Sequence, residues 1–250
     1  MSDLGQAAER IRRAGHIFVL TGAGVSAESG LPTFRGANGH WHSHRVEELA
    51  SPEGFARNPA LVWAWYNERR AAHATVAPNA GHLALARIEA ASANFTLATQ
   101  NVDSLHRRAG SRNVLELHGN LREARCDRCG TRLPLAGPLA PEEIAHSCGG
   151  KFRPDIVWFG EALPRDKWER ALEAASHADV VLVVGTSGAV EPAASLATRA
   201  PRDDAFVIEV NPEHSAISYR ADAVLRGSAA AILPQLAETA ARKGVSCGPT

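Results

Sequence analysis

The sequence lacks an excess of either charge and lacks long apolar runs. Among its 250 residues, 27 lysines and arginines balance 27 aspartates and glutamates, so the formal net charge at pH 7 is zero. This balance argues against nucleic acid or a membrane surface as a partner, since both attract strongly charged chains. No apolar stretch approaches the roughly 20 residues that span a bilayer. The first residues carry neither a basic segment nor an apolar core, so we expect no secretory signal and a cytoplasmic protein.

Cysteine is also scarce, and internal repeats and low-complexity segments are absent from the sequence. Three of the four cysteines lie between Cys126 and Cys148, which favours a reduced intracellular metal site over a disulfide framework. Cys126 and Cys129 have the Cys-x-x-Cys spacing typical of tetrahedral zinc. Cys247 lies in the last residues, which read as a loose tail, and we expect it to be an idle thiol.

Strand-like and helical segments alternate along the chain. Apolar runs rich in β-branched residues recur at 17–20, 95–98, 114–117, 180–184, 206–210 and 223–225. Segments with helical spacing lie between most of them. The alternation predicts an α/β fold, with a Rossmann-like, mostly parallel sheet covered by helices on both faces. Several runs end in polar or glycine residues, so we expect these strand ends to surround one ligand-binding crevice.

Two stretches interrupt the alternation and predict a smaller inserted lobe. Residues 37–78 contain a long helical segment, and residues 122–156 contain the clustered cysteines among proline and glycine turns. The larger lobe is then expected to comprise approximately residues 1–36, 79–121 and 157–240. A chain of this length can bury a sizeable core. No long amphipathic seam for a partner subunit is visible, which favours a monomer.

The most informative segment follows the first apolar run. Gly22, Gly24 and Ala27 form a G-x-G-x-x-A pattern at a strand-to-helix turn, where bare N–H groups can contact a pyrophosphate. Glycine lets the main chain turn sharply and approach phosphates that a Cβ would obstruct. The alternative is a plain glycine-rich turn. Residues 31–36 favour the binding loop, because they form an apolar, proline-bearing loop rather than an ordinary helix.

Two other strand ends carry groups suited to chemistry. Residues 99–106, with the sequence TQNVDSLH, are dense in hydrogen-bonding groups. The competing interpretation, which is the better one for a capping residue taken alone, is that Asp103 or Ser104 is a helix cap. His118 follows the third run. A single histidine at a strand end is often structural, yet its ordinary pKa suits proton transfer near neutrality.

Taken together, these segments resemble the sirtuins, the NAD-dependent protein-lysine deacylases. The resemblance extends from about residue 11 to about residue 236. It runs in order through GAGVSAESGLPTFRG, TQNVDSLHRRAG, LHG, the Cys-x-x-Cys pair, RPDIVWFGE, GTS and VNP. Several long motifs in sequence are highly specific. The pattern is most similar to bacterial and mitochondrial-type members that remove acidic acyl groups.

The resemblance implies that NAD is the co-substrate and that acylated-lysine proteins are the partners. The residues expected to bind NAD are Gly22, Ala23, Gly24, Ala27, Glu28, Phe34, Arg35, Trp41, Gln100, Asn101, Asp103, Gly185, Thr186, Ser187, Asn211, Pro212, Glu213 and Ala229. It further implies that His118 is the general base on a ribose hydroxyl, and that nicotinamide and O-acyl-ADP-ribose are released.

A second set of residues is expected to bind the substrate peptide. The resemblance implies main-chain pairing of an extended peptide with the segment Val157, Trp158, Phe159, Gly160 and Glu161. Such pairing would tolerate many sequences around the modified lysine.

The pair Tyr66 and Arg69 bears on the choice of acyl group. Residues three or four apart in a predicted helix share a face, so Tyr66 could act with Arg69 or with Arg70. From the residues alone, a packed tyrosine beside solvated arginines is the competing interpretation. The family pattern Tyr-x-x-Arg implies that the pair recognises the carboxylate of succinyl-, malonyl- or glutaryl-lysine. We therefore expect an enzyme that removes both succinyl and acetyl groups.

The metal site departs from the family pattern. Only Cys148 stands where a second cysteine pair is expected, and residue 145 is alanine. His146 is a candidate fourth ligand at a cramped spacing from Cys148. The alternatives are a structural zinc held by Cys126, Cys129, Cys148 and His146, and a metal-free lobe held by its own turns.

Three other functional classes compete with a deacylase. One is a non-catalytic NAD or ADP-ribose sensor, against which Asn101, Asp103 and His118 argue together. Another is mono-ADP-ribosyl transfer to protein. A zinc-dependent nucleic-acid module has little support, because the charge is neutral and only three cysteines cluster.

Overall fold

The computed structural model describes residues 2–32, 40–41, 44–200 and 205–241. The main sheet consists of β1 (His16–Thr21), β4 (Asn94–Thr99), β5 (Val114–Glu116), β9 (Val180–Val184), β10 (Phe206–Asn211) and β11 (Ala223–Arg226). All neighbours pair in parallel, in the order β11-β10-β9-β1-β4-β5. The expected α/β fold is confirmed. The strand order reverses on either side of β1, and open sheets of this kind bind ligands beyond the carboxyl ends of the strands at such a point.

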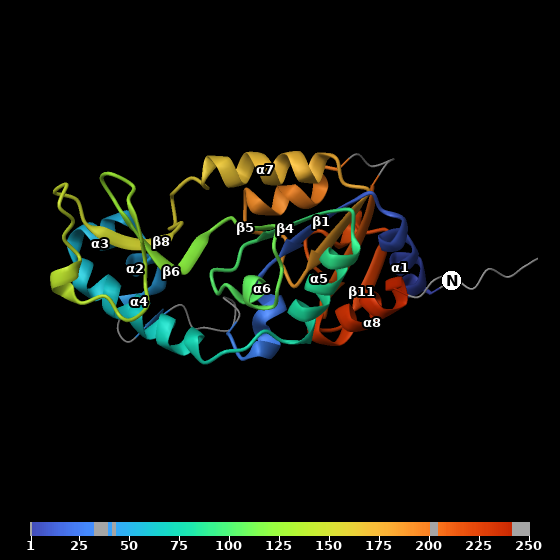
Figure 1. Cartoon of the computed structure of the whole chain (residues 1–250), viewed down its shortest axis with the longest axis horizontal. Coiled ribbons are helices and arrows are strands. Elements are labelled where there is room, and N and C mark those ends of the chain that lie inside the picture. Colours follow the sequence, from blue (N-terminus) through green and yellow to red (C-terminus); the bar gives the residue numbers. More distant parts are fainter. Residues whose placement is uncertain (1, 33–39, 42–43, 201–204, 242–250) are drawn as a thin grey trace, which may run out of the picture.

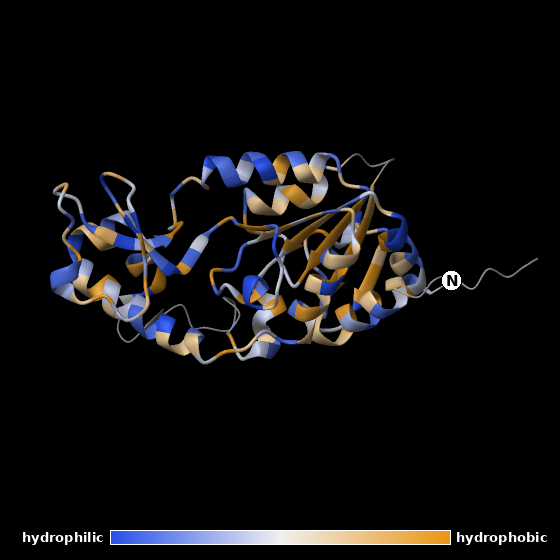
Figure 2. Ribbon diagram, in the orientation of Figure 1, coloured by the Kyte–Doolittle hydropathy of each residue, from blue (hydrophilic) through white to orange (hydrophobic). Residues whose placement is uncertain are grey.

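Helices cover both faces of this sheet. The helices α1 (Asp3–Arg13), α5 (Ala80–Ala91) and α8 (Ala229–Ala241) pack on one face, and α7 (Arg165–Ser176) and the 3-10 helix η3 (Ala193–Thr198) pack on the other (Figure 1). Alternate side chains of each strand therefore enter different cores: Ile17 joins the first core and Phe18 the second. Burial on both faces explains why the strands read as continuous apolar runs, which Figure 2 shows in orange.

A third apolar core lies apart from the sheet, at the left of Figure 1. The helices around it are α2 (Val46–Leu49), α3 (Pro52–Arg57) and α4 (Pro59–Ala74). An antiparallel sheet in the order β7-β6-β8 completes it, formed by β7 (Arg132–Pro134), β6 (Gly119–Cys126) and β8 (Phe152–Ile156). The helical segment expected in this lobe is confirmed as α4, while the exact lobe boundaries stay predictions.

Local sequence explains how α3 and α4 begin. Ser51 and Asn58 each accept a hydrogen bond from the backbone N–H of the third residue of the following helix, and a proline is the first residue of both helices. The remaining short elements are η1 (Ala23–Ser29), β2 (His40–Trp41), β3 (His44–Arg45), α6 (Leu105–Arg108), η2 (Pro141–Glu143) and η4 (Ser218–Arg220).

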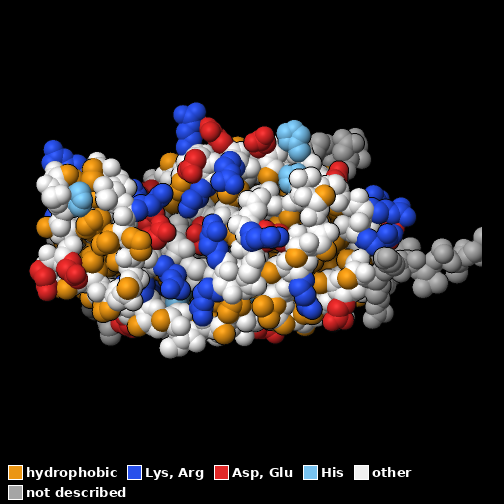
Figure 3. Space-filling model, in the orientation of Figure 1, with side chains coloured by type: hydrophobic (Ala, Val, Ile, Leu, Met, Phe, Trp, Pro, Cys, Tyr) orange, Lys and Arg blue, Asp and Glu red, His pale blue; other side chains and the backbone are white. Residues whose placement is uncertain are grey.

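The surface agrees with the balanced composition. Acidic and basic side chains lie on the same face of the molecule (Figure 3). No helix in the described part of the chain has both the length and the apolar character that a membrane crossing requires. Cys247 lies outside the described residues.

Candidate active site

The glycine turn lies against the end of β9. The N–H of Gly24 donates to the carbonyl of Gly185 at 2.8 Å, and the N–H of Gly22 donates to the carbonyl of Val184 at 3.1 Å. A Cβ on Gly24 would lie 2.7 Å from the Gly185 oxygen, and one on Gly22 would lie 2.8 Å from the Thr186 side chain. The neighbouring loop therefore requires glycine at both positions, a reason additional to the expected approach of phosphates. A 3-10 helix, η1, follows the turn and contains Ala23 and Ala27.

Thr186 joins three strand ends. Gln100, after β4, donates from Nε2 to the Thr186 hydroxyl at 3.1 Å, and Asn211, at the end of β10, donates from Nδ2 to the Thr186 carbonyl at 2.9 Å. The expected convergence of the polar strand ends is thus present. Ser187 continues this loop, and its carbonyl accepts from Ala216.

A buried polar network lies beside the glycine turn. The Ser26 hydroxyl donates to Asp103 at 2.8 Å and accepts from the Asn101 side chain at 3.1 Å. The second carboxylate oxygen of Asp103 accepts the N–H of Leu105, so Asp103 closes the turn that precedes α6, whose N-cap residue is Ser104, and it also belongs to the strand-end cluster. Burial raises the pKa of the Asp103 carboxyl, against the effect of these hydrogen bonds.

Sequence reasoning missed one member of this network, His82. Its Nδ1 accepts the N–H of Asn79 at 3.3 Å, which leaves the ring proton on Nε2, 3.3 Å from the Ser26 hydroxyl. Burial lowers the pKa of His82 to about 4, so the ring stays neutral. The only local signal is the Asn79 cap at the start of α5, which predicts the helix but not the contact with Ser26.

His118 lies between β5 and β6, and one main-chain contact decides its tautomer. Its Nδ1 lies 3.0 Å from the carbonyl oxygen of Gln100. A carbonyl can only accept, so Nδ1 carries the proton and Nε2 presents a lone pair. Burial lowers the pKa of the imidazole, with the Gln100 carbonyl acting in the opposite direction. The ring is therefore a neutral proton acceptor near pH 7.

The expected peptide-binding segment begins beside His118. Val157 donates its N–H to the His118 carbonyl at 2.9 Å, and Phe159 donates to the Ala50 carbonyl at 3.1 Å. The N–H of Trp158 donates to the Glu161 carboxylate at 2.8 Å. These N–H groups are used within the protein, so a peptide pairing here would donate to main-chain carbonyls of the segment. The Phe159 side chain is 56% exposed.

Tyr66 and Arg69 lie together on α4 in the third core. The Tyr66 side chain is fully buried, and its hydroxyl accepts from the indole Nε1 of Trp158 at 2.8 Å. Burial raises the pKa of Tyr66 to about 12, so the phenol keeps its proton. The Arg69 guanidinium carbon lies 4.9 Å from the Trp65 ring centroid and 5.7 Å from that of Tyr66.

The two neighbouring arginines of α4 have different surroundings. Arg70 donates to the carbonyls of Leu135 and Gly137 and so joins α4 to a loop of the same lobe. Burial lowers the pKa of Arg69, and among the described residues no carboxylate forms an ion pair with it. Both arginines are only partly exposed: Arg70 is tied to the loop by hydrogen bonds, and Arg69 lies against the rings of Trp65 and Tyr66.

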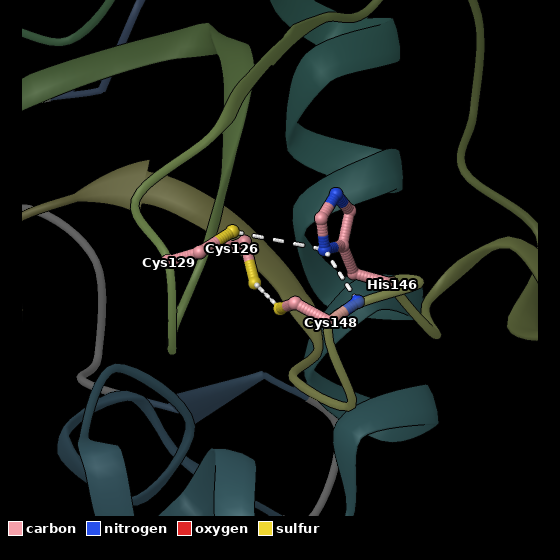
Figure 4. Close-up of side chains that lie close together, drawn as sticks. All are labelled: Cys126, Cys129, His146 and Cys148. Carbon is pink, nitrogen blue, oxygen red and sulfur yellow. Dashed lines mark hydrogen bonds between the residues drawn. The ribbon is translucent and has the colours of Figure 1, made fainter.

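Cys126, Cys129, His146 and Cys148 form one cluster (Figure 4). One ligand atom from each lies within 4.8 Å of the others. The Cys126 and Cys148 sulfurs are 3.5 Å apart, and the Cys129 sulfur lies 3.7 Å from His146 Nδ1. With Zn–S bonds near 2.3 Å, adjacent ligands of a tetrahedron are separated by about 3.7 Å, so this group could hold zinc.

The cramped spacing of His146 and Cys148 is accommodated by a tight turn. The N–H of Gly149 donates to the His146 carbonyl at 2.9 Å, and the N–H of Cys148 points at His146 Nδ1 at 3.2 Å. Nδ1 is therefore the unprotonated nitrogen, as a metal ligand must be. Gly150 contributes as well, because a Cβ there would lie 2.8 Å from the Cys126 sulfur.

Among the remaining residues predicted to bind NAD, some are described by the structure and others are not. Phe34 and Arg35 lie outside the described residues, and only the backbone of Trp41, in β2, is described. The Glu28 carboxylate accepts the N–H of Ala230 at 3.0 Å, next to buried Ala229 at the start of α8. Pro212 and Glu213 follow β10, and the Glu213 carbonyl accepts from Arg226 at 2.6 Å.

Comparison with known proteins supplies the family. Residues 22–192 match the Sir2 family. The chain is 49% identical over 239 residues to "NAD-dependent protein deacylase 2" of Pyrobaculum aerophilum, covering 94% of this chain and 95% of that protein. It is 53% identical over 210 residues to "NAD-dependent protein deacylase" of Aquifex aeolicus, covering 83% and 87%.

Solved structures agree with these relatives. A Sir2 homolog–NAD complex superposes with a TM-score of 0.88 at 42% identity, covering 94% of this chain and 93% of the other. A mutant Sir2 homologue in complex with 2'-O-acetyl ADP ribose superposes with a TM-score of 0.86 at 41% identity, covering 94% and 95%. The resemblance to the sirtuins is confirmed: the chain belongs to the Sir2 family.

Proposed function

We propose that this protein is an NAD-dependent protein-lysine deacylase that removes both acetyl groups and acidic acyl groups of the succinyl or malonyl type. Family membership and relatives named NAD-dependent protein deacylase support the general activity. One observation carries the assignment to this site. His118 has its proton held on Nδ1 by Gln100, and its Nε2 has no hydrogen-bond partner among the described residues, at the strand ends where the sheet order reverses.

In this proposal one set of residues binds NAD and another residue, His118, transfers a proton. NAD, when bound, supplies an activated ribose that accepts the acyl group as nicotinamide leaves. The glycine turn and Thr186 loop would hold the dinucleotide, and Gln100, Asn101 and Asp103 would hold its ribose and carboxamide. His118 Nε2 would take a proton from a ribose hydroxyl, a step that typically contributes on the order of 10²–10⁴-fold.

The acidic-acyl preference rests on Arg69. Arg69 is a partly buried cation with no carboxylate partner among the described residues, which favours an anionic ligand, and the neighbouring Tyr66 phenol is a protonated donor. A hydrogen bond to a charged group contributes about 1.5–3 kcal/mol. This is enough for a roughly 10- to 100-fold preference over an uncharged acyl group.

One experiment separates the proposed activity from its competitors. The protein is incubated with NAD and a succinylated peptide, and the products are identified by mass spectrometry. A deacylase yields free peptide and O-acyl-ADP-ribose. An unchanged peptide would favour an NAD or ADP-ribose sensor, and an ADP-ribosylated peptide would favour transfer to protein.

In this proposal zinc stabilises the structure and takes no part in the reaction. Cys126, Cys129, His146 and Cys148 would hold the ion, whose contribution is to fix the turns that these residues join. No proton transfer in the proposed reaction requires it. A cytoplasmic monomer acting on acylated-lysine proteins stays a prediction.

A further inference from the structure

The indole of Trp158 joins the peptide-binding segment to the acyl-recognition pair. Its Nε1–H donates to the Tyr66 hydroxyl at 2.8 Å, a contact between residues 92 positions apart in the chain. Both side chains are buried, with 3% of Trp158 and 1% of Tyr66 exposed. Water therefore cannot replace the indole as a partner of the phenol oxygen without a rearrangement of this core.

The indole itself is held firmly in place. The guanidinium carbon of Arg153 lies 3.4 Å from the centroid of the Trp158 ring, and Phe55 lies 5.5 Å from it, centroid to centroid. The main-chain N–H of Trp158 donates to the Glu161 carboxylate, which also pairs with both terminal nitrogens of Arg153. A donor fixed by several partners presents its N–H in one direction, so the phenol oxygen that accepts it is fixed as well.

The direction of the phenol proton follows from this contact. Because the Tyr66 oxygen accepts from the indole, its own O–H must point elsewhere, and within the described residues no acceptor takes that proton. Arg69 lies over the Tyr66 ring, 5.7 Å from its centroid. The phenol proton and a guanidinium that pairs with no carboxylate in the described part of the chain therefore lie close together.

We propose that Trp158 is a positioning residue for acidic acyl groups: its indole N–H occupies the acceptor side of Tyr66 and so leaves the phenol proton for the substrate carboxylate. The inference rests on the proposed recognition of such groups by Tyr66 and Arg69. Phenylalanine could fill the same space, but it has no N–H. The competing interpretation is a core tryptophan whose indole merely satisfies a buried oxygen.

The test compares kcat/KM for a succinylated and an acetylated form of one peptide, measured with saturating NAD on the same preparation of each variant. Both peptides meet the same folded molecules, so partial unfolding cancels in the ratio. Trp158→Phe keeps an aromatic ring and removes the donor. We expect the succinyl-to-acetyl ratio to fall about three- to tenfold, mainly through KM for the succinylated peptide.

Trp63→Phe is the matched control. The Trp63 indole is equally buried in the third core, but it donates to the Phe152 carbonyl at 2.9 Å instead of to Tyr66. This variant should lower the midpoint of thermal unfolding and leave the ratio at the wild-type value. If the succinyl-to-acetyl ratio of kcat/KM fell equally in both variants, the effect would come from general loosening of the core, and the proposal would be overturned.

A double substitution tests whether Trp158 acts through Tyr66. The ratio for Tyr66→Phe/Trp158→Phe should equal that for Tyr66→Phe alone, whereas effects that multiply would overturn the proposal. If Arg69→Met lowers the ratio and Trp158→Phe does not, only the role of Trp158 fails. If Arg69→Met also leaves the ratio unchanged, the acidic-acyl preference fails with it.

A spectroscopic readout covers a Trp158→Phe variant that does not fold. The chain has five tryptophans, so the indole N–H resonance of Trp158 in 15N-labelled wild-type protein with NAD is assigned by elimination, from single substitutions to phenylalanine at the other four positions. It should shift on binding of the succinylated peptide more than on binding of the acetylated one. Equal responses to the two peptides would contradict the proposal.

Discussion

His118 owes its proposed role to a single main-chain carbonyl. The Gln100 oxygen holds the proton on Nδ1, and burial lowers the pKa of the ring. Neither fact is visible in the motif LHG, which supplies a histidine after a strand and nothing about its tautomer. The sequence thus predicts the histidine, and the packing of the Gln100 loop against its ring decides which ring nitrogen can accept a proton.

His118→Ala should retain NAD binding and lose most turnover, on the order of 10²–10⁴-fold, because only the proton acceptor is removed. Calorimetric titration with NAD and a turnover assay measure the two effects. His177→Ala is the control, since that side chain is exposed and lies against the Glu173 carbonyl near the end of α7. Near-full turnover of His118→Ala would show that the base is assigned wrongly.

Arg69→Met should depress kcat/KM for a succinylated peptide roughly 10- to 100-fold, and for an acetylated peptide much less, because only the former has a carboxylate to pair with the guanidinium. Arg70→Met is the matched control. It loses the bonds to the Leu135 and Gly137 carbonyls and should reduce stability without changing selectivity. Equal loss on both peptides for Arg69→Met would refute the specificity role.

At the scale of elements, the close approach of η1 to the end of β9 makes Gly24 sensitive to any side chain. Gly24→Ala would place a Cβ 2.7 Å from the Gly185 oxygen, and backbone cannot retreat cheaply. We expect a loss of about 1–3 kcal/mol of unfolding free energy together with weaker NAD binding. Gly137→Ala, which meets nothing within 4 Å, should be near neutral in the same denaturant titration. Comparable stability of the two variants would contradict the tight packing.

The cysteine-bearing turns give a prediction about metal. Protein purified without chelator should contain close to one zinc per chain, and a chelator should lower the midpoint of thermal unfolding. His146→Ala should lose metal more readily than the wild type, whereas His177→Ala should not. Cobalt substitution gives an independent readout, since thiolate ligands produce strong near-ultraviolet charge-transfer bands. Metal-free protein with an unchanged midpoint would favour a lobe held by its own turns.

At the scale of the whole molecule, two buried neutral histidines make stability depend on pH. Burial lowers the pKa of His82 to about 4 and that of His106 well below its ordinary 6.5. In the unfolded chain each of these histidines takes up a proton near pH 6.5, and in the folded chain it does not. Their contribution to the free energy of unfolding is therefore complete above that pH and is lost as the pH falls. Each histidine should remove about 1.4 kcal/mol per pH unit below 6.5, down to its folded pKa.

Urea unfolding at pH 7.5 and pH 5 measures this loss. His82→Gln removes one of the titrating groups and should reduce the dependence on pH, although the variant itself is less stable. An unfolding free energy that stays constant between the two pH values would contradict the neutral, buried state of these rings.

The strands, the α/β class and the family were accessible from the sequence, because they depend on local signals. Runs of β-branched residues form buried strands, and the long family motifs are contiguous in the chain. Ser51 and Asn58 cap their helices through hydrogen bonds with N–H groups only three positions ahead. His146 shows where such signals stop. Its spacing from Cys148 reads as cramped, and only the turn through Gly149 and Gly150 brings its ring to the sulfurs.

The tertiary structure alone decided which partners each polar group has. The indole of Trp158 meets the phenol of Tyr66 across 92 positions in the chain. Arg69 is partly buried and pairs with no carboxylate of the described residues, while Arg70, one residue later, is tied to a loop. A helix repeats every 3.6 residues, so adjacent side chains point in directions about 100° apart, and the elements packed around them decide which partners each one meets. Sequence specified the chemical groups and the elements that carry them, whereas their charge states and contacts arise from burial and long-range packing.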